Sequence, residues 1–163
     1  MAIIRLAHTE PVNPKGTAPA ITEAQIFAAF QRKIRQPQDF VTAIADCTVL
    51  SDEAGVVKRK VHFKQIGGDK PHVATELCTE LPPHRVDFEM DNGSTVLNIV
   101  SAGPSGEPWD LYITYVFAWN RPELAVDSPA YAEAVAGYKA AAKTAVVSSI
   151  ATTRQLVSEG KIE

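Results

Sequence analysis

The chain has 163 residues, of which 21% are charged, and a formal net charge of −3 at pH 7. This length allows one domain whose hydrophobic core needs neither a disulfide nor a metal to hold it together. Positive and negative residues are interspersed, so the sequence offers no basic patch for a nucleic acid or an anionic membrane surface.

No stretch contains the roughly 20 consecutive apolar residues of a membrane span, and the first residues lack the basic and apolar segments of a signal peptide. We therefore expect a cytoplasmic protein without a membrane span. Cys47 and Cys78 are then expected to be reduced, buried thiols, with a disulfide between them as the alternative. No feature of the sequence specifies an oligomer.

The first third of the chain predicts a short strand followed by two helices. Residues 4–9 form the strand, and a proline-containing loop follows it. The segment Thr22-Glu23-Ala24-Gln25 fits a capping box, and Ile21 and Ile26 are spaced as a hydrophobic staple. Pro37 ends this helix, because the residue before a proline avoids the α conformation. Residues 39–45 are predicted to form a second short helix.

From residue 47 onward the apolar period changes from helical to alternating, and turn signals recur about every ten residues. This pattern is typical of antiparallel strands joined in series. The predicted strands are residues 48–51, 56–65, 72–80, 85–91, 95–102 and 110–120.

The turns set the register of these strands. The Asn92-Gly93 dipeptide predicts a two-residue hairpin turn. Together with Leu81 opposite His84 and Gln65 opposite Pro71, the turns place Phe88 opposite Leu97, Leu77 opposite Phe88, and Phe63 opposite Val73. All three registers then give one apolar face.

The last strand can face either way, because a shift of one residue exchanges its two sides. We expect the more apolar set to point inward. That set is Leu111, Ile113, Tyr115, Phe117 and Trp119, against Tyr112, Thr114, Val116, Ala118 and Asn120.

Residues 128–157 predict one long helix, with apolar or small residues repeating every three or four positions. Ser128 is placed to cap its first turn, Pro129 suits the first helical position, and Gly160 is a plausible stop. A helix of roughly 45 Å needs an equally long partner surface, and the sheet is the candidate. The expected fold is therefore α+β, with a curved antiparallel sheet of about seven strands wrapped on the C-terminal helix.

Several stretches resemble the AtaL-like family, formerly a domain of unknown function. They are Pro11-Val12-Asn13, Ile21-Thr22-Glu23-Ala24-Gln25-Ile26, Arg35-Gln36-Pro37-Gln38-Asp39-Phe40-Val41, Leu111-Tyr112-Ile113-Thr114-Tyr115-Val116-Phe117 and Thr153-Arg154-Gln155-Leu156-Val157-Ser158-Glu159-Gly160. The resemblance runs nearly end to end, with Phe27 where family patterns often have Trp. It implies the helix-grip fold of the SRPBCC superfamily, which includes START domains and the birch-pollen allergen.

The resemblance also implies a hydrophobic cavity between the sheet and the C-terminal helix. Such a cavity would bind a polyketide, a lipid-like molecule or another apolar secondary metabolite. The alternative is a cofactor-independent cyclase, isomerase or pericyclic catalyst of secondary metabolism that uses the same cavity. The family supplies no established catalytic residues, and no cofactor is expected.

The residues predicted to line the cavity come from the inner face of the strands, the first helix and the stripe of the last helix. They are Phe27, Arg59, Val61, Phe63, Thr75, Leu77, Val86, Phe88, Met90, Leu97, Ile99, Tyr115, Phe117, Trp119, Tyr131, Val135, Tyr138 and Ala142.

Arg59 and Tyr138 are the candidate catalytic residues. Arg59 on an inner face either orients an anionic oxygen of a ligand or lies at the rim and extends to water. Tyr138 and Tyr131 either project phenols into the cavity or are ordinary core aromatics. His8 and Glu23 are further candidates for a general acid or base. The sequence has no nucleophile elbow, phosphate-binding loop, dinucleotide fingerprint or metal-ligand set.

Overall fold

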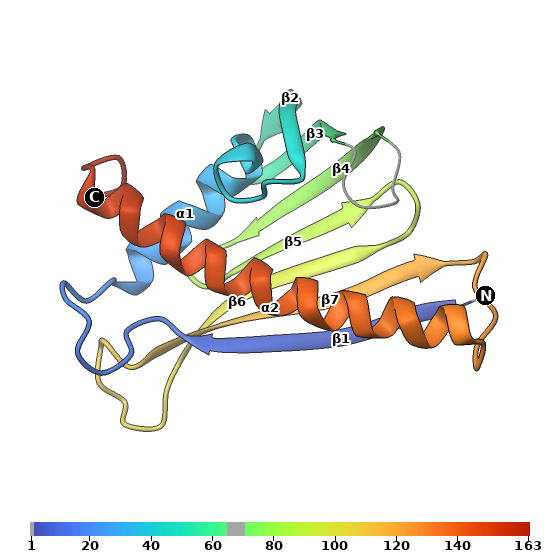
Figure 1. The fold of residues 1–163 in the computed structure, drawn as a ribbon. Helices are drawn as coiled ribbons and strands as arrows, with labels where there is room; N and C mark the ends of the chain where they lie inside the picture. Colours follow the sequence, from blue (N-terminus) through green and yellow to red (C-terminus); the bar gives the residue numbers. More distant parts are fainter. Residues whose placement is uncertain (1, 65–70) are drawn as a thin grey trace.

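The computed structural model describes residues 2–64 and 71–163. Seven strands form one antiparallel sheet in the order β1-β7-β6-β5-β4-β3-β2 (Figure 1). The strands are β1 (Ala2–Pro11), β2 (Ile44–Glu53), β3 (Val56–Phe63), β4 (His72–Leu81), β5 (Arg85–Met90), β6 (Thr95–Ala102) and β7 (Leu111–Arg121). The helices are α1 (Glu23–Arg35), the short 3₁₀ turn η1 (Pro37–Asp39) and α2 (Pro129–Ser158).

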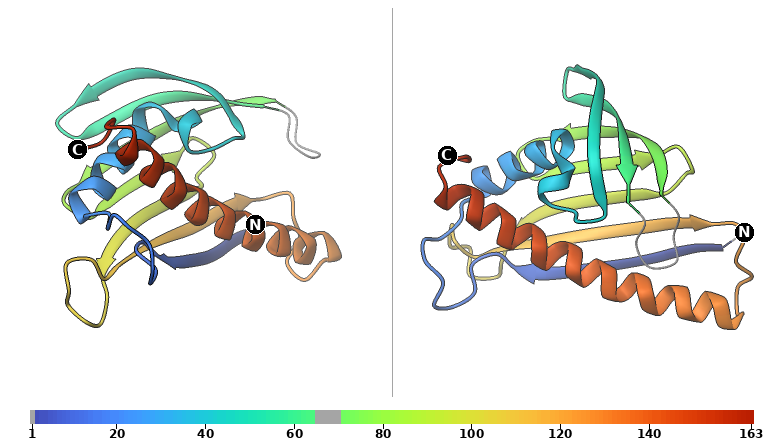
Figure 2. Two further views of the ribbon diagram at one scale, coloured as in Figure 1. Left: turned by 60° about the vertical axis from the view of Figure 1, so that its left-hand side comes forward. Right: turned by 45° about the horizontal axis from the view of Figure 1, so that its top comes forward.

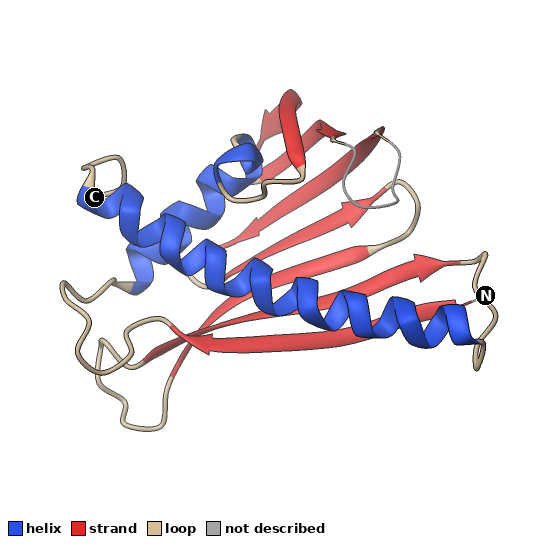
Figure 3. Ribbon diagram, viewed as in Figure 1, coloured by secondary structure: helices blue, strands red, loops and turns tan. Residues whose placement is uncertain are grey.

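Both helices lie on the same, concave face of the sheet (Figures 1 and 2). The long helix α2 runs beside β1 and β7, and it also contacts α1. Figure 3 shows the two helices crossing one side of the strands while the other side carries no helix. The predicted α+β arrangement, a curved sheet around a long C-terminal helix, is confirmed.

The start of α1 has the predicted capping box. The Thr22 hydroxyl accepts a hydrogen bond from the Gln25 backbone N–H at 3.2 Å, and the Gln25 side chain accepts from the Thr22 N–H at 3.0 Å. Ile21 and Ile26, the expected staple pair, are both buried. These contacts satisfy backbone donors that have no partner within the helix.

Replacing Thr22 with alanine should therefore lower the free energy of unfolding by about 0.5–2 kcal/mol. Urea denaturation followed by circular dichroism measures this change. Thr22→Ser keeps a hydroxyl that can cap the helix, so it serves as the matched control and should stay close to the wild type. An alanine variant as stable as the serine variant would contradict this role for the cap.

Both ends of α2 are also as predicted. The Ser128 hydroxyl accepts from the Tyr131 N–H at 3.1 Å, and Pro129 occupies the first turn. At the other end Gly160 adopts a positive φ of 66°, its N–H binds the Val157 carbonyl, and the Lys161 N–H binds the Leu156 carbonyl. This is a Schellman motif, in which a left-handed glycine lets the chain turn back on the last carbonyls.

The prediction of a second helix over residues 39–45 is wrong. Only the 3₁₀ turn η1 follows α1, and β2 begins at Ile44, earlier than the predicted strand 48–51. β2 pairs with β3 from Ile44 opposite Phe63 to Glu53 opposite Val56, with two irregularities. The ladder to β3 satisfies backbone groups over ten residues, which outweighs the weak helical pattern of this short segment.

The predicted hairpin registers are wrong by one residue. The β5–β6 loop contains three residues, because the Met90 N–H binds the Ser94 carbonyl and Gly93 adopts a φ of 82°. Leu81 pairs with Arg85, so the β4–β5 loop also has three residues. Phe63 pairs with His72, while the predicted pair of Gln65 with Pro71 lies outside the described residues.

Each shift turns the next strand over, so the errors alternate along the chain. The inner faces of β3, β5 and β7 are confirmed, and those of β4 and β6 are inverted. Tyr115 and Phe117 point inward as expected. Four predicted cavity residues lie instead on the outer face, and Leu77 among them is 40% exposed. The four are Thr75, Leu77, Leu97 and Ile99.

Residues from three of the family-like stretches meet at one end of the molecule. Asn13 donates to the carbonyls of Ile21 at 2.9 Å and Trp109 at 3.0 Å, and accepts from the Ile21 N–H. Arg154 of α2 donates to the carbonyls of Val12 and Pro19. These bonds tie the loop after β1 to α1 and α2, so the stretches have a structural role.

Neither helix in the described residues is apolar over a length that could cross a membrane. Cys47 and Cys78 are both free thiols, and burial is the main cause that raises the pKa of Cys78 to about 12. Within residues 2–64 and 71–163, no three side chains of His, Cys, Asp or Glu are grouped to hold a metal ion.

Candidate ligand site on the concave face

A hydrophobic core closes one end of the concave face. α1 and the C-terminal half of α2 cover the strands there, and their side chains form one buried cluster with the sheet. Its members include Val12, Ile21, Ile26, Phe27, Phe30, Ile34, Val57, Cys78, Val86, Val100, Leu111, Ile113 and Val146. The core fixes the position of α1 against the sheet.

Two groups of polar side chains lie on this otherwise apolar face, and they are offset by four residues along β5, where Met90 lies opposite Glu76 and Val86 lies opposite Asn98. Arg59 of β3 lies opposite Glu76 of β4. Asn98 of β6 lies opposite Tyr115 of β7, and Tyr115 lies opposite His8 of β1. A closed hydrophobic core does not require such groups, so each one needs a partner.

Arg59 and Glu76 form a buried ion pair, with 3% and 2% of their surfaces exposed. Arg59 Nε donates to Glu76 Oε2 at 2.8 Å, and Arg59 Nη1 donates to the Lys33 carbonyl at 2.8 Å and to the Ile34 carbonyl. These carbonyls belong to the last turn of α1, where carbonyls lack helical partners and favour a cation. Arg59 therefore joins the end of α1 to the sheet, and the interpretation that it lies at the rim is wrong.

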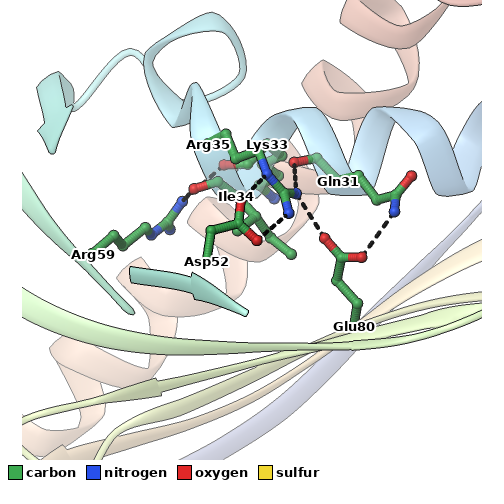
Figure 4. A network of polar contacts seen from close by, with 7 residues as sticks. All are labelled: Gln31, Lys33, Ile34, Arg35, Asp52, Arg59 and Glu80. Carbon is green, nitrogen blue, oxygen red and sulfur yellow. Dashed lines mark hydrogen bonds and ion pairs between the residues drawn. The ribbon is translucent and has the colours of Figure 1, made fainter. Parts of the chain in front are cut away.

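A second network lies beside Arg59, as Figure 4 shows. Arg35 Nε donates to Asp52 Oδ2 at 2.7 Å, and Arg35 Nη1 donates to Glu80 Oε1 at 2.6 Å. The Gln31 amide donates to the other oxygen of Glu80 at 2.8 Å. Together the two networks attach α1 to β2, β3 and β4.

Lys33 projects from α1 into the interior and is only 8% exposed. Its Nζ lies 4.2 Å from the centroid of the Tyr115 ring and 5.9 Å from that of Phe88. Among the described residues it has no hydrogen-bond partner and no carboxylate within ion-pair distance. Burial, and secondarily the charge of Arg59, lower the pKa of Lys33 from its usual value to about 7, while Glu76 opposes this shift.

Three further polar side chains lie at or beside Tyr115, the ring that Lys33 contacts, and their buried polar atoms make no hydrogen bond of good geometry in the described part of the chain. They are both amide atoms of Asn98, the Tyr115 hydroxyl and the Ser149 hydroxyl of α2. Burial raises the pKa of the Tyr115 phenol well above its usual range, and hydrogen bonding by the neighbouring Ser149 hydroxyl opposes that rise only in part. Tyr115 is therefore neutral at pH 7 and can act as a donor or an acceptor.

His8 and Glu10 extend the group of Asn98 and Tyr115 to the edge strand β1. His8 Nε2 lies 2.7 Å from Glu10 Oε1, and both side chains are partly exposed. Their partial exposure leaves them accessible from the flank of α2. The earlier candidate His8 thus lies on the concave side, whereas Glu23 occupies the first turn of α1 and is exposed.

The other end of the concave face, under the N-terminal half of α2, is only partly covered. Trp119 stacks between Phe117 at 5.7 Å and Tyr138 at 5.3 Å, measured between ring centroids. The Tyr138 hydroxyl accepts a hydrogen bond from Arg121 Nη1. Trp119, Tyr138 and Val135 are partly exposed, so an apolar molecule meets aromatic surface at this end. Tyr138 lies here rather than beside the buried polar groups.

Two cavities lie near α2, and the first of them reaches Glu10. One, of about 430 Å³, lies between β1, the loop after it and the flank of α2, and it is lined by Glu10, Val147, Ile150 and Arg154 among others. The other, of about 200 Å³, lies near the C-terminus of α2 beside Arg32 and Asp39. The predicted enclosed cavity between the sheet and α2 corresponds to neither of them.

The structure therefore brings some of the predicted site residues together and places others elsewhere. Besides the residues already described, Val61 and Ala142 are buried on the concave side, and Met90 packs against the core. Tyr131 and Phe63 are partly exposed. Sequence reasoning missed Lys33, Glu76, Asn98 and Ser149. One signal was available, because an inward Arg59 needs a carboxylate and Glu76 lies opposite it when the β3–β4 register moves by one residue.

Comparison with solved structures finds the same fold in several proteins. The di-domain ARO/CYC StfQ from the steffimycin biosynthetic pathway aligns with a TM-score of 0.71 at 8% identity, over 98% of this chain and 52% of StfQ. This chain thus spans about half the length of StfQ. The Zhui aromatase/cyclase from Streptomyces sp. R1128 aligns with a TM-score of 0.64 at 13% identity, over 96% of each chain.

Ara h 8.0201 aligns with a TM-score of 0.61 at 12% identity, over 94% of this chain and 99% of that one. At these identities the likeness concerns the fold alone. No curated protein sequence is significantly similar to this chain. The family model described as acetylaranotin biosynthesis cluster protein L matches residues 6–160. The chain belongs to this AtaL family, whose helix-grip fold places it in the SRPBCC superfamily.

Proposed function

We propose that the chain binds a largely apolar, oxygen-bearing secondary metabolite between the concave face of the sheet and α2. The observation that carries this proposal is the buried amide of Asn98, which has no hydrogen-bond partner in the described residues, together with the buried hydroxyls of Tyr115 and Ser149, which lie beside each other. A bound molecule with oxygen atoms would supply the missing hydrogen bonds, and the surrounding aromatic side chains would bind its apolar part.

The comparisons support the same class of ligand. The family takes its description from a biosynthesis cluster, and two of the similar folds are aromatase/cyclases. The partly exposed Trp119 and Tyr138 would form the entrance to the interior.

Titration with 2-methoxynaphthalene, followed by NMR, tests this proposal. The chain has two tryptophans, which act as internal reporters. The indole N–H signal of Trp119 on the concave face should shift saturably, whereas that of Trp109, which is 54% exposed on a distant loop, should stay in place. Equal shifts of both signals, or no saturable shift, would contradict binding at the concave face.

Variants of α2 provide a matched pair for the same titration. Val135→Phe enlarges a side chain on the face toward the sheet and should weaken binding about tenfold or more, because it fills the entrance. Ala140→Phe makes a comparable change on the exposed side of the helix and should leave binding unchanged.

A cofactor-independent enzyme that uses the same site is the second candidate, and Lys33 favours it. A buried amine whose pKa is near neutrality can exchange a proton with a bound substrate at physiological pH. Incubation of the wild type with a synthetic poly-β-ketone, followed by mass spectrometry, would detect a cyclised product. Product formed by the wild type and not by Lys33→Met would favour the enzyme, and binding without any product would favour the carrier.

A further inference from the structure

Lys33 is a buried cation, and the carboxylate that could act as its counter-ion is already paired with another residue. Glu76 is the carboxylate whose charge raises the pKa of Lys33. Arg59, however, donates to this carboxylate through Nε and Nη2. A buried ammonium without an anion of its own carries a large desolvation cost. The contact with the Tyr115 ring at 4.2 Å offsets only a part of that cost.

The groups that face Lys33 from the packed elements are otherwise neutral. Arg59 of β3 and Glu76 of β4 cancel each other in net charge. Tyr115 of β7 is held neutral by burial, and Asn98 of β6 and Ser149 of α2 carry no charge. The interior therefore has one unmatched amine on the Tyr115 ring, and the unpaired amide of Asn98 and the hydroxyl of Ser149 also lie beside Tyr115.

We propose that Lys33 binds the acidic oxygen of a phenol or an enol, and that Asn98, Tyr115 and Ser149 complete the hydrogen bonds around this oxygenated part of the ligand. This inference rests on the proposed function, and it names the class of ligand that the site selects. The phenol or enol would lie with its oxygen at Lys33 Nζ and its apolar skeleton toward the open end of the concave face.

A phenol or enol fits this position better than a carboxylate because it can enter as a neutral molecule. Inside, the ligand O–H bond breaks, its electron pair stays on the oxygen, and the proton forms an N–H bond on the neutral Lys33 amine. The product is an ammonium–oxyanion pair, and the net charge of the interior does not change. A pKa of about 7 leaves part of the Lys33 population neutral at physiological pH and able to accept that proton.

The walls next to Lys33 suit a flat, conjugated molecule. Phe88 and Tyr115 flank the amine, and Phe30 packs against Tyr115 with ring centroids 6.3 Å apart. Aromatic rings prefer offset-stacked or edge-to-face contact with other rings. An aromatic phenol or a conjugated enol therefore satisfies both the polar groups and the apolar wall.

A pair of ligands that differ only in the acidic proton tests this inference. 2-Naphthol and 2-methoxynaphthalene share one skeleton, and the ether has no proton to transfer. By calorimetric titration the wild type should bind the naphthol at least tenfold more tightly than the ether, because an ion-paired hydrogen bond is stronger than a neutral one. Lys33→Met should bind both ligands equally, because the preference for the acidic proton is lost.

A spectroscopic measurement separates proton transfer from a structural effect of the substitution. Naphtholate absorbs at longer wavelength than naphthol, so the bound ligand should show the naphtholate band with the wild type at neutral pH and lose it with Lys33→Met. Lys143→Met removes an exposed lysine of α2 and should behave as the wild type.

The outcomes distinguish this inference from the proposed function. If the wild type binds the ether but binds the naphthol no better, or if the preference survives in Lys33→Met, the role of Lys33 is overturned and the ligand site stands. If the wild type binds neither compound, both proposals are overturned for aromatic ligands.

Discussion

Replacing Arg59 with methionine should lower the free energy of unfolding by about 3–5 kcal/mol, because it removes the cation that hydrogen-bonds the buried carboxylate of Glu76. The same change removes the donor that binds the carbonyls of Lys33 and Ile34 at the end of α1. Urea denaturation at pH 7 measures the loss. A variant within 1 kcal/mol of the wild type would contradict the structural role of this pair.

Two further variants show whether the effect comes from the unpaired charge. The double variant Arg59→Met, Glu76→Leu leaves no buried charge at either position, so it should recover a large part of the stability. Arg85→Met breaks the pair with Asp87, in which the Arg85 side chain is 40% exposed, and should cost less than about 1 kcal/mol. The contrast follows from burial, because water screens the exposed pair and cannot reach the buried one.

In contrast to Arg59→Met, replacing Lys33 with methionine should raise the free energy of unfolding, by roughly 2–5 kcal/mol at pH 6. Methionine has a similar length and buries no amine. In the wild type, the folded state lowers the pKa of Lys33 from 10.5 to about 7. Below pH 7 the amine is protonated in both the folded and unfolded states, so the full cost of burying the charge is present.

Between pH 7 and 10.5 the unfolded chain binds more protons at Lys33 than the folded chain, so the stability of the wild type rises with pH. The advantage of Lys33→Met should therefore shrink from pH 6 to pH 9. Urea denaturation at several pH values measures both curves, and Lys143→Met should run parallel to the wild type. A Lys33→Met variant less stable than the wild type, or a gain in stability that does not change with pH, would show that folding does not lower the pKa of Lys33.

The opposite effects expected for Arg59→Met and Lys33→Met separate a buried charge that the fold compensates from one that it does not. A chain whose interior served only for packing would gain stability from an apolar residue at position 33. The expected gain from methionine means that the amine at position 33 is costly in the absence of a ligand, as is common for functional groups in binding sites. Arg59 differs because Glu76 and the end of α1 already compensate its charge.

Most of the secondary structure could be predicted from local patterns. The capping box at Thr22, the Ser128 cap and the Gly160 stop place the helix ends through contacts within a few residues. The alternating strands from residue 56 onward also follow from local sequence. The beginning of β2 could not be predicted in this way, because its residues gain their hydrogen bonds from β3 rather than from their neighbours in sequence.

The candidate site was harder to predict, because it depends on contacts between distant elements. Glu76 and Asn98 lie on strand faces that are no more apolar than the opposite faces of the same strands, so the length of the hairpin loops and not the apolar pattern decided which face turned inward. The sequence pattern of α1 did not indicate that Lys33 would be buried, since lysine on an amphipathic helix is usually exposed. Its position depends on the attachment of α1 to the sheet by Arg35 and Arg59.

The amino-acid sequence by itself determined the order of the elements, the caps of both helices, and the inward faces of β3, β5 and β7, since each of these depends on residues close together in the chain. Only the tertiary structure decided that Lys33, Asn98, Tyr115 and Ser149 meet in the interior. The physical reason is that their helices and strands are placed by long-range packing and by buried charge pairing, and neither leaves a periodic signal in the sequence.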